Sequence, residues 1–293
     1  MRDQETVFSV HVILLNWNRC DDTLECLASL RSSTYHPLHL LVVDQHSNDS
    51  SPSRIRATYP EVEVVELGQN VGFAAGMNAG ICHALEKRAT HLLLLNNDTI
   101  VHPEMVAELM AQLKPGVGMV GPAIFYYDRP VEVWSTGGDI HPLLLEMSGN
   151  HGRDRALPSQ PEAQGFLSGC ALLMPRATVE RVGLWDERFF MYYEDLDYCL
   201  RIKESGLTLV LAPAAHLWHK VSASSGGSAS PAERYQMAKS SGLYFRKYME
   251  LWRAPFILLF RLGSALLWTW RLARQARWNA LAAYWHGLGD GWL

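Results

Sequence analysis

The first 120 residues alternate short apolar runs with polar or helix-like stretches, and this alternation restricts the fold more than any other feature. The apolar runs are residues 9–15, 38–43, 62–67, 92–95 and 117–120. Short runs rich in Val, Ile and Leu predict buried strands. Strands that alternate with helices predict a mostly parallel sheet covered by helices on both faces, which is an α/β fold of Rossmann-like type.

Polar clusters follow three of the predicted strands directly. Asn16-Trp17-Asn18 comes after the first strand, Asp44 after the second, and Asn96-Asn97-Asp98 after the fourth. In parallel α/β sheets, ligands bind outside the carboxyl ends of the strands. We therefore expect these side chains to converge on one edge of the sheet and to form a ligand site there.

The second half of the chain is less regular. Residues 123–164 are rich in Gly, Pro and aromatic residues, which predicts irregular strands and loops near an acceptor site, whereas residues 194–204 and 232–249 have helical patterns. The stretch 222–230 (SASSGGSAS) has the composition of a flexible loop. We expect one domain over residues 1–250, with a nucleotide-binding half (7–122) and an acceptor half (123–250).

The tail, residues 251–293, differs in composition from the rest of the chain. Residues 255–270 (PFILLFRLGSALLWTW) are nearly long enough to span a bilayer, but Arg261 interrupts them, and further arginines alternate with tryptophans after them. Arg and Trp interleaved with Leu are typical of a helix lying in a membrane interface. We expect an amphipathic helical tail that contacts a membrane surface. Packing on the domain, or contact between copies in a homo-oligomer, are the alternatives.

Composition excludes some classes of protein. The net charge is only -4 and charged residues make up 19% of the chain, so no electrostatic drive toward nucleic acid is expected. The five cysteines form no C-x-x-C pair, which favours a reduced, cytoplasmic compartment. The charged N-terminus lacks the apolar core of a signal peptide, so no cleaved targeting sequence is expected.

Carboxylates in two places suit group-transfer chemistry. Asp98 follows a very apolar strand, where a hard metal ion and phosphates would meet. Glu194, Asp195 and Asp197 lie in the first turn of a predicted helix, directly after the aromatic run FFMYY. Acids are common in a first helical turn, because they interact favourably with the helix dipole. Aromatic neighbours also raise the pKa of a carboxyl group, which favours its use as a general base. We predict Asp195 as the base, Glu194 as acceptor-site support and Asp197 as a structural residue.

Two further segments complete the set of candidates. His216 and His219 follow an apolar strand, and one of them could join Asp98 in a mixed nitrogen and oxygen metal site. The segment 68–80 (GQNVGFAAGMNAG) places small residues at a helix start, which allows close backbone approach to an anion. It matches neither a P-loop nor G-x-G-x-x-G, so a dinucleotide oxidoreductase is disfavoured.

Taken in order, five blocks resemble the family-2 glycosyltransferases, which have the GT-A fold, and in particular their rhamnosyltransferase-like branch. The blocks are VILLNWNRCDDTLECLASL, LLVVDQHSNDSS, NVGFAAGMNAGI, LLLLNNDTIVHPE and GLWDERFFMYYEDLDYCLRIKESG. They run from about residue 9 to residue 226 and leave the tail outside. The resemblance implies an inverting enzyme of cell-wall or polysaccharide biosynthesis that moves a sugar from a nucleotide diphosphate donor, dTDP-rhamnose or a UDP-sugar, to a hydroxyl of a glycan or lipid-linked glycan.

The resemblance also implies roles for individual residues. Asp195 is the catalytic base, with Glu194 beside it, and Asp98 and His219 hold Mg²⁺ or Mn²⁺. Asp44 contacts the base of the nucleotide. The remaining donor-site residues are Asn16, Asn18, Asn70, Gly72, Phe73, Asn78 and Asn97. Such an enzyme is expected in the cytoplasm, on the cytoplasmic face of the membrane.

Two positions depart from the family pattern. Asn96 replaces the first acid of a D-x-D motif, which removes one charge from the metal site, and Gln45 stands where Asn is usual. Two other functions remain as alternatives: a nucleotidyltransferase, and a non-catalytic carbohydrate-binding protein with the same fold. The first would need a basic, Gly-rich loop near the first strand, and the second would not need Asp98 and Asp195 together.

Overall fold

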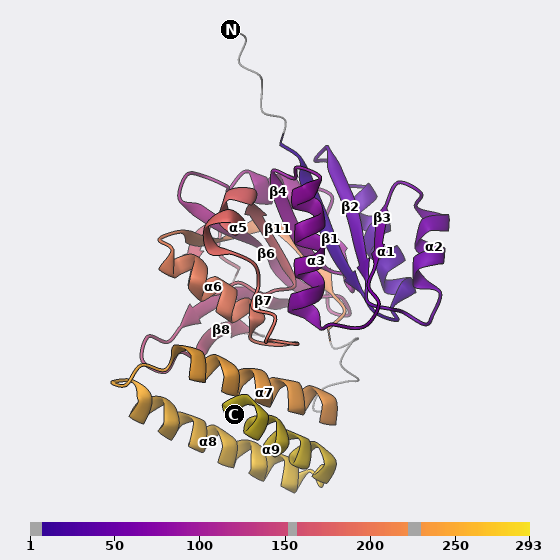
Figure 1. Ribbon diagram of the computed structural model, residues 1–293. Helices are drawn as coiled ribbons and strands as arrows, with labels where there is room; N and C mark the ends of the chain where they lie inside the picture. Colours follow the sequence, from indigo (N-terminus) through magenta and orange to yellow (C-terminus); the bar gives the residue numbers. More distant parts are fainter. Residues whose placement is uncertain (1–7, 152–156, 222–229) are drawn as a thin grey trace.

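A computed structural model describes residues 8–151, 157–221 and 230–293, and it has the α/β fold expected from the sequence (Figure 1). The predicted loop at residues 222–230 lies almost wholly outside the described residues. The described elements are, in order, β1 (Val10–Asn16), α1 (Cys20–Arg31), β2 (Leu38–Asp44), α2 (Ser51–Thr58), β3 (Glu63–Glu66), α3 (Phe73–Glu86), β4 (His91–Asn96), β5 (Thr99–Val101), α4 (Met105–Met110), β6 (Val117–Tyr126), β7 (Val133–Ile140), β8 (Met147–His151), β9 (Glu162–Gln164), β10 (Ala171–Pro175), α5 (Arg176–Val182), α6 (Glu194–Glu204), β11 (Thr208–His219), α7 (Pro231–Tyr248), α8 (Ala254–Arg274) and α9 (Trp278–Trp292).

The strands form one mixed sheet in the order β3-β2-β1-β4-β10-β6-β11-β5. The first four strands of this order are parallel, as predicted. β10 runs antiparallel between β4 and β6, although it comes from a much later part of the chain. β11 then pairs parallel with β6, and the short β5 closes the order antiparallel to β11.

The strand register places the polar clusters side by side. Asn16 at the end of β1 pairs with Asp44 at the end of β2, and Leu15 pairs with Asn96 at the end of β4. The predicted convergence on one sheet edge is therefore confirmed.

Both faces of the sheet are buried, which explains why its strands are continuously apolar. Along β4, Leu92 and Leu94 pack on the side of α3 and α6, while Leu93 and Leu95 pack on the side of α1 and α4. This period of two follows from the pleat of the strand.

Residues 123–164 are more regular than predicted. β6 continues to Tyr126, and β7 and β8 extend it as an antiparallel hairpin. The Gly and Pro residues that suggested loops lie partly inside these strands, because antiparallel strands near a sheet edge tolerate bulges and close approaches.

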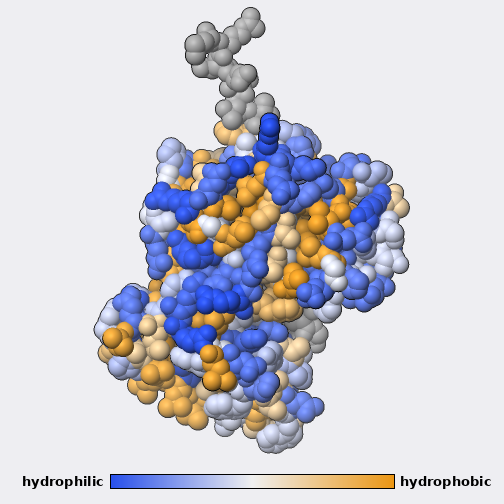
Figure 2. Space-filling model, in the orientation of Figure 1, coloured by the Kyte–Doolittle hydropathy of each residue, from blue (hydrophilic) through white to orange (hydrophobic). Residues whose placement is uncertain are grey.

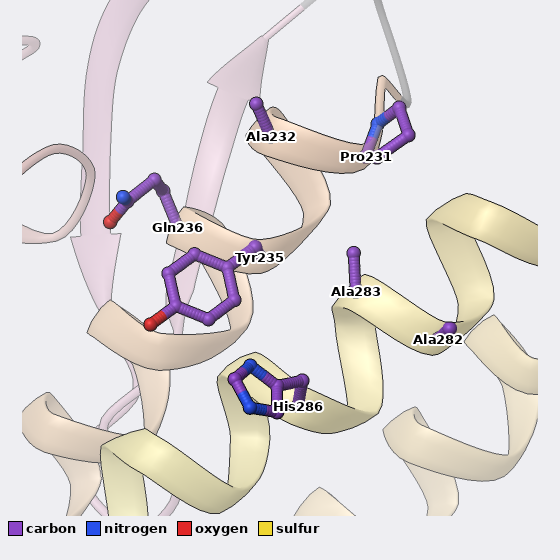
Figure 3. A pocket seen from close by; sticks show the side chains of 7 residues that line it. All are labelled: Pro231, Ala232, Tyr235, Gln236, Ala282, Ala283 and His286. Carbon is purple, nitrogen blue, oxygen red and sulfur yellow. The ribbon is translucent and has the colours of Figure 1, made fainter.

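The last three helices form a layer below the α/β part, with α7 nearest to it (Figure 1). α7 and α9 approach closely because α9 has glycines, Gly287 and Gly291, at the points of contact. A Cβ at either position would clash with the backbone of Tyr235 or Lys239. A shallow recess of about 550 Å³ opens between these two helices (Figure 3) and is lined by Pro231, Ala232, Tyr235, Gln236, Ala282, Ala283 and His286.

α8 leaves much of its apolar surface exposed. Leu259 is 71% exposed and Leu266 58% exposed, and Figure 2 shows apolar residues gathered at the lower left of the molecule, where α8 begins. By length and composition, α8 is also the one described helix that could cross a membrane.

Candidate active site

The ends of β1 and β2 are joined by a buried hydrogen-bond network. Asn16 Nδ2 donates to Asp44 Oδ2 at 2.6 Å. The Asp44 carboxylate also accepts from the backbone N–H of Ser47 at 2.9 Å and from its hydroxyl at 2.7 Å. Because only 1% of Asp44 is exposed, it acts here as an organiser of the loop after β2. Its predicted contact with a nucleotide base stays a prediction.

The network extends to both neighbouring loops. The Ser47 hydroxyl accepts from the backbone N–H of Asn18, and Asn18 Oδ1 accepts from the N–H of Asn48, at 2.8 and 2.7 Å. On the other side, Asn97 Nδ2 donates to the hydroxyl of Thr23, which donates to Asn16 Oδ1, both at 2.8 Å. The predicted residues after three separate strands therefore form one connected rim.

Gly72 brings the start of α3 against the segment that precedes α6. Its φ of 89° and ψ of 177° are essentially restricted to glycine, and a Cβ here would lie 2.6 Å from the carbonyl oxygen of Phe190. The N–H of Phe73 donates to that same oxygen at 2.6 Å. Asn70 Oδ1 accepts from the N–H of Gly72 at 3.0 Å and so fixes the turn. The two predicted halves of the cleft meet at this point.

Asp98 and His219 form a buried pair although 121 positions separate them. Asp98 Oδ1 lies 3.1 Å from His219 Nε2, and both side chains are 8% exposed. The β5–β11 ladder brings them together, since Thr99 pairs with His219 and the N–H of Lys220 donates to the backbone oxygen of Asp98. His216, the other candidate, packs against His102 with tilted rings, 4.2 Å between centroids, and is not part of this pair.

The charges of the pair reinforce each other. Burial acts to raise the pKa of Asp98, but the hydrogen bond and charge of His219 outweigh it, and the net pKa of that carboxyl is lowered. Burial likewise acts to lower the pKa of His219, whereas Cys170 and Asp98 raise it to about 10. The two groups therefore form an ion pair. One oxygen and one nitrogen donor thus converge at this point of the rim.

The segment before β10 links Asp98 to Asp195. The N–H of Asn96, two residues before Asp98, donates to the carbonyl oxygen of Cys170 at 2.8 Å. The N–H of Gly169 donates to Asp195 Oδ2 at 2.9 Å, and a Cβ on Gly169 would lie only 3.2 Å from that of Asp195. The N–H of Leu196 donates to Asp195 Oδ1 at 2.8 Å. The Asp195 carboxylate is therefore held in place at the same edge as the Asp98 pair.

Comparison with known proteins shows the family of the chain. The family described as glycosyl transferase family 2 matches residues 11–183, which is more than half of the chain. The chain belongs to this family. It is therefore a glycosyltransferase, and of the three functions considered from the sequence this one is confirmed.

Curated relatives include rhamnosyltransferases. The chain is 28% identical over 272 residues to the N-acetylglucosaminyl-diphospho-decaprenol L-rhamnosyltransferase of Mycobacterium tuberculosis, which covers 82% of this chain and 85% of that protein. It is 23% identical over 219 residues to the dTDP-rhamnosyl transferase RfbF of Shigella flexneri, with 71% of each covered.

The fold has solved counterparts. The mannosyltransferase PcManGT from Pyrobaculum calidifontis, in complex with GDP-Man and Mn²⁺, superposes with a TM-score of 0.60 at 18% identity, covering 94% of this chain and 73% of that one. GalNAc-T7 with UDP, GalNAc and Mn²⁺ gives a TM-score of 0.60 at 15% identity, covering 82% of this chain and 48% of that one. The expected GT-A fold is thus confirmed.

Asn78 of the glycosyltransferase holds a loop in place through its side-chain amide. Its Nδ2 donates to the carbonyl oxygen of Trp185 and to Glu187 Oε1, and its Oδ1 accepts from the N–H of Trp185, each at 2.9 Å. Only 3% of Asn78 is exposed. It shapes the cleft by fixing the loop ahead of the aromatic run, and the structure shows no amide donor left for a ligand.

The three acids of α6 differ sharply in their surroundings. Burial, followed by the nearby charge of Asp195, raises the pKa of Glu194, and its Oε2 is buried without a hydrogen-bond partner. Asp197 is fully buried and accepts from Arg201 at 2.9 Å, Lys247 at 2.5 Å and Tyr248 at 2.8 Å. The structural role predicted for Asp197 is confirmed.

The backbone is strained immediately before Glu194. Tyr192 and Tyr193 both adopt positive φ values, of 70° and 68°. For residues with a large side chain, each such conformation costs on the order of 1–3 kcal/mol and persists only where the surroundings impose it. The strain lies at the entry to the segment that carries Asp195.

Sequence reasoning missed several residues that build this site. Thr23 and Ser47 connect the rim, Gly169 and Cys170 join its two halves, and the Trp134 ring packs edge-on against His219 at 4.8 Å between centroids. Small residues directly before the apolar run 171–175 were a usable signal for Gly169. Ser47 lies in the block LLVVDQHSNDSS, three residues after its partner Asp44, so that block was a usable signal for it. Trp134 carries no such signal, because its partner His219 comes from a distant segment.

Proposed function

We propose that this glycosyltransferase is an inverting enzyme that transfers a sugar, rhamnose from dTDP-rhamnose in the first instance, to a hydroxyl of a lipid-linked glycan. The observation that carries the proposal is the linkage of the Asp98–His219 pair to Asp195 through residues 169 and 170 at one sheet edge. The names of the mycobacterial and Shigella relatives support rhamnose and a polyprenyl diphosphate acceptor.

A divalent cation fits the Asp98–His219 pair. One carboxylate oxygen and one imidazole nitrogen approach each other within 3.1 Å in a buried setting, and such donors suit Mn²⁺ or Mg²⁺. Among the described residues no group of three His, Cys, Asp or Glu side chains could hold a metal ion, so phosphate oxygens of the donor would complete the shell, as is usual for Mg²⁺. When bound, the ion neutralises the charge that develops on the departing diphosphate.

Asp195 is the proposed general base. Its carboxylate is oriented by the N–H groups of Gly169 and Leu196. It accepts the proton of the acceptor hydroxyl while the hydroxyl oxygen bonds to the anomeric carbon. The bond between that carbon and the diphosphate oxygen breaks, and its electron pair leaves with the diphosphate. Because attack comes opposite the leaving group, the configuration at the anomeric carbon inverts.

Glu194 would support this step as a neutral group. A proton on its buried carboxyl avoids a second negative charge next to Asp195. Asp195 can then stay ionised at neutral pH and is free to accept the proton of the hydroxyl.

We further propose that the enzyme works at the cytoplasmic face of a membrane, with α8 lying in the lipid interface. The outward face of α8 carries Phe256, Leu259, Leu262, Leu266 and Trp270, each more than half exposed. Arginines follow in its last turn, where they suit anionic headgroups. A lipid-linked acceptor would be presented at this surface.

The proposal is tested with a panel of nucleotides and a transfer assay. Thermal unfolding is recorded with dTDP, UDP and GDP, each with and without Mn²⁺, because ligands that bind the native state raise Tm. We expect the largest Mn²⁺-dependent rise with dTDP. Transfer from dTDP-rhamnose to a short polyprenyl diphospho-N-acetylglucosamine should follow, with an inverted anomeric centre in the product. A retained configuration, or a Tm that responds to GDP alone, would contradict the proposal.

A further inference from the structure

Arg261 is the one charged residue in the stretch 254–270, and its side chain points into the protein. The side chain is only 11% exposed. Its Nη2 donates to the Ser241 hydroxyl of α7 at 2.7 Å, and its guanidinium lies over the ring of Phe245, 4.7 Å from the centroid. The residue that interrupts the apolar pattern in the sequence therefore leaves the outward face of α8 free of charge.

Arg261 also reaches two segments of the acceptor half. Its Nη1 lies 3.9 Å from Glu146 Oε2, directly before β8. The Phe245 ring beneath the guanidinium packs in turn on the ring of Tyr193. Burial, followed by the charge of Glu146, raises the pKa of the Tyr193 phenol, whereas the charge of Arg261 opposes that rise. One guanidinium from the C-terminal helices is thus shared between α7, the β7–β8 hairpin and the residue directly before Glu194.

The strained turn before α6 is held from the same side. The ring of Tyr193 packs on Tyr244 and Phe245 of α7, at 5.4 and 6.3 Å between centroids. The hydroxyl of Ser240 donates to the carbonyl oxygen of Met191 at 2.7 Å. Tyr193 in turn begins α6, since its carbonyl oxygen accepts from the N–H of Asp197. The turn with the two positive φ values is therefore packed directly against α7.

We propose that Arg261 is a positioning residue that fixes Tyr193, and with it the start of α6 and Asp195. Binding of α8 to a lipid surface is then transmitted through Arg261 to the segment that carries Asp195. The outward face of α8 would rest on lipid while its inward residue holds the turn. The positioning itself follows from the contacts above, whereas the coupling to lipid rests on the proposed function.

The positioning role is tested by steady-state kinetics of the full chain with dTDP-rhamnose. Arg261→Met keeps the apolar stem but removes the charge and the donors. We expect kcat to fall on the order of 10- to 100-fold, because small displacements of a reacting group have effects of this size. The KM for the donor should change less than about twofold, since ground-state donor binding is untouched. Arg261→Lys should recover part of kcat.

The matched control is Arg246→Met, which removes an exposed arginine of α7 that contacts the carbonyl oxygen of Trp292. It should leave kcat unchanged. An Arg261→Met enzyme with the kcat of this control, or with a donor KM that rises as much as kcat falls, would overturn the positioning role. Should Arg261→Met fail to fold, Tyr193→Phe decides, because it keeps the ring and removes only the phenol oxygen; an unchanged kcat there refutes the proposal.

The coupling is tested with vesicles of phosphatidylglycerol and phosphatidylcholine in equal parts. We expect the vesicles to raise kcat of the unmodified enzyme and to leave kcat of Arg261→Met unchanged, although both proteins sediment with the vesicles. A variant that responds as the unmodified enzyme does would refute the coupling. If the unmodified enzyme does not sediment, the membrane part of the proposed function fails and the coupling fails with it, while the kinetics without vesicles still decide the positioning role.

Discussion

Replacing Gly72 by alanine tests whether the contact between α3 and the segment before α6 is as tight as described. At a φ of 89° and a ψ of 177°, an alanine would be strained by about 1–3 kcal/mol. Its Cβ would also fall 2.6 Å from the carbonyl oxygen of Phe190, so the two segments must separate. The hydrogen bond from the N–H of Phe73 to that oxygen would then be lost, at a cost of about 0.5–1.5 kcal/mol.

The two terms together predict a loss of about 2–4 kcal/mol in the free energy of unfolding. For a chain of this size the corresponding fall in Tm is roughly 3–7 °C. The assay is urea unfolding followed by fluorescence, with Gly68→Ala as the matched control. A Cβ at Gly68 would have no neighbour within 4 Å and needs no special φ. If both variants unfold at the same urea concentration, the argument about Gly72 is wrong.

Three further predictions concern the acids of the site and one buried histidine. Asp195→Asn should lower kcat by roughly 10²–10⁴-fold, because it removes the general base. Isothermal titration should still give the affinity of the unmodified enzyme for dTDP, since no contact with the donor is lost. Weakened dTDP binding would contradict the role of Asp195 as the base. Asp98→Asn should remove the Mn²⁺-dependent part of the Tm rise with dTDP, and an unchanged rise would place the metal elsewhere. Burial, followed by the nearby His39, lowers the pKa of His11 to about 4. Below about pH 6.5 the unfolded chain therefore binds a proton at His11 that the native state does not bind. The free energy of unfolding falls for this reason as the pH drops toward 4. Urea unfolding near pH 7 and near pH 5 should show a smaller difference for His11→Gln than for the unmodified protein, and equal differences would contradict the assignment.

The sequence was most informative where one local rule determines the outcome. The ends of β1, β2 and β4 were predictable because a buried strand stops where its apolar run stops. Parallel neighbours then bring those ends to one edge, so Asn16, Asp44 and Asp98 could be placed there without knowing the strand order. The helix predicted over 194–204 has those same limits in the structure.

Contacts between distant segments were not predictable in the same way. β10 is an apolar run like the others, and nothing in residues 171–175 reveals that it enters the sheet between β4 and β6. The pairing of Asp98 with His219 depends on the ladder between β5 and β11, which is only three residues long. Such a ladder has no pattern that could be recognised within a single sequence.

Orientation within a helix was the other gap. Arg261 looked like an interruption of a lipid-facing helix, and only the packing of α8 on α7 shows that it faces inward. Asn78 likewise lies in a small-residue helix start that suggests nucleotide contact, yet its amide binds the loop at Trp185 and Glu187. The domain limits near residue 250 and the contact of the tail with a membrane stay predictions.

The position of β10 also sets a condition on how the chain can assemble. β4 and β6 are separated in the sheet by a strand that follows both of them in the sequence. As the chain leaves the ribosome, β3, β2, β1 and β4 can pair with one another early, because all four lie within the first 96 residues. The outer edge of β4 keeps its unpaired N–H and C=O groups until residues 171–175 have emerged. The nucleotide side can therefore begin to form alone, whereas the edge that joins it to the acceptor side has to wait for roughly three fifths of the polypeptide to be synthesised.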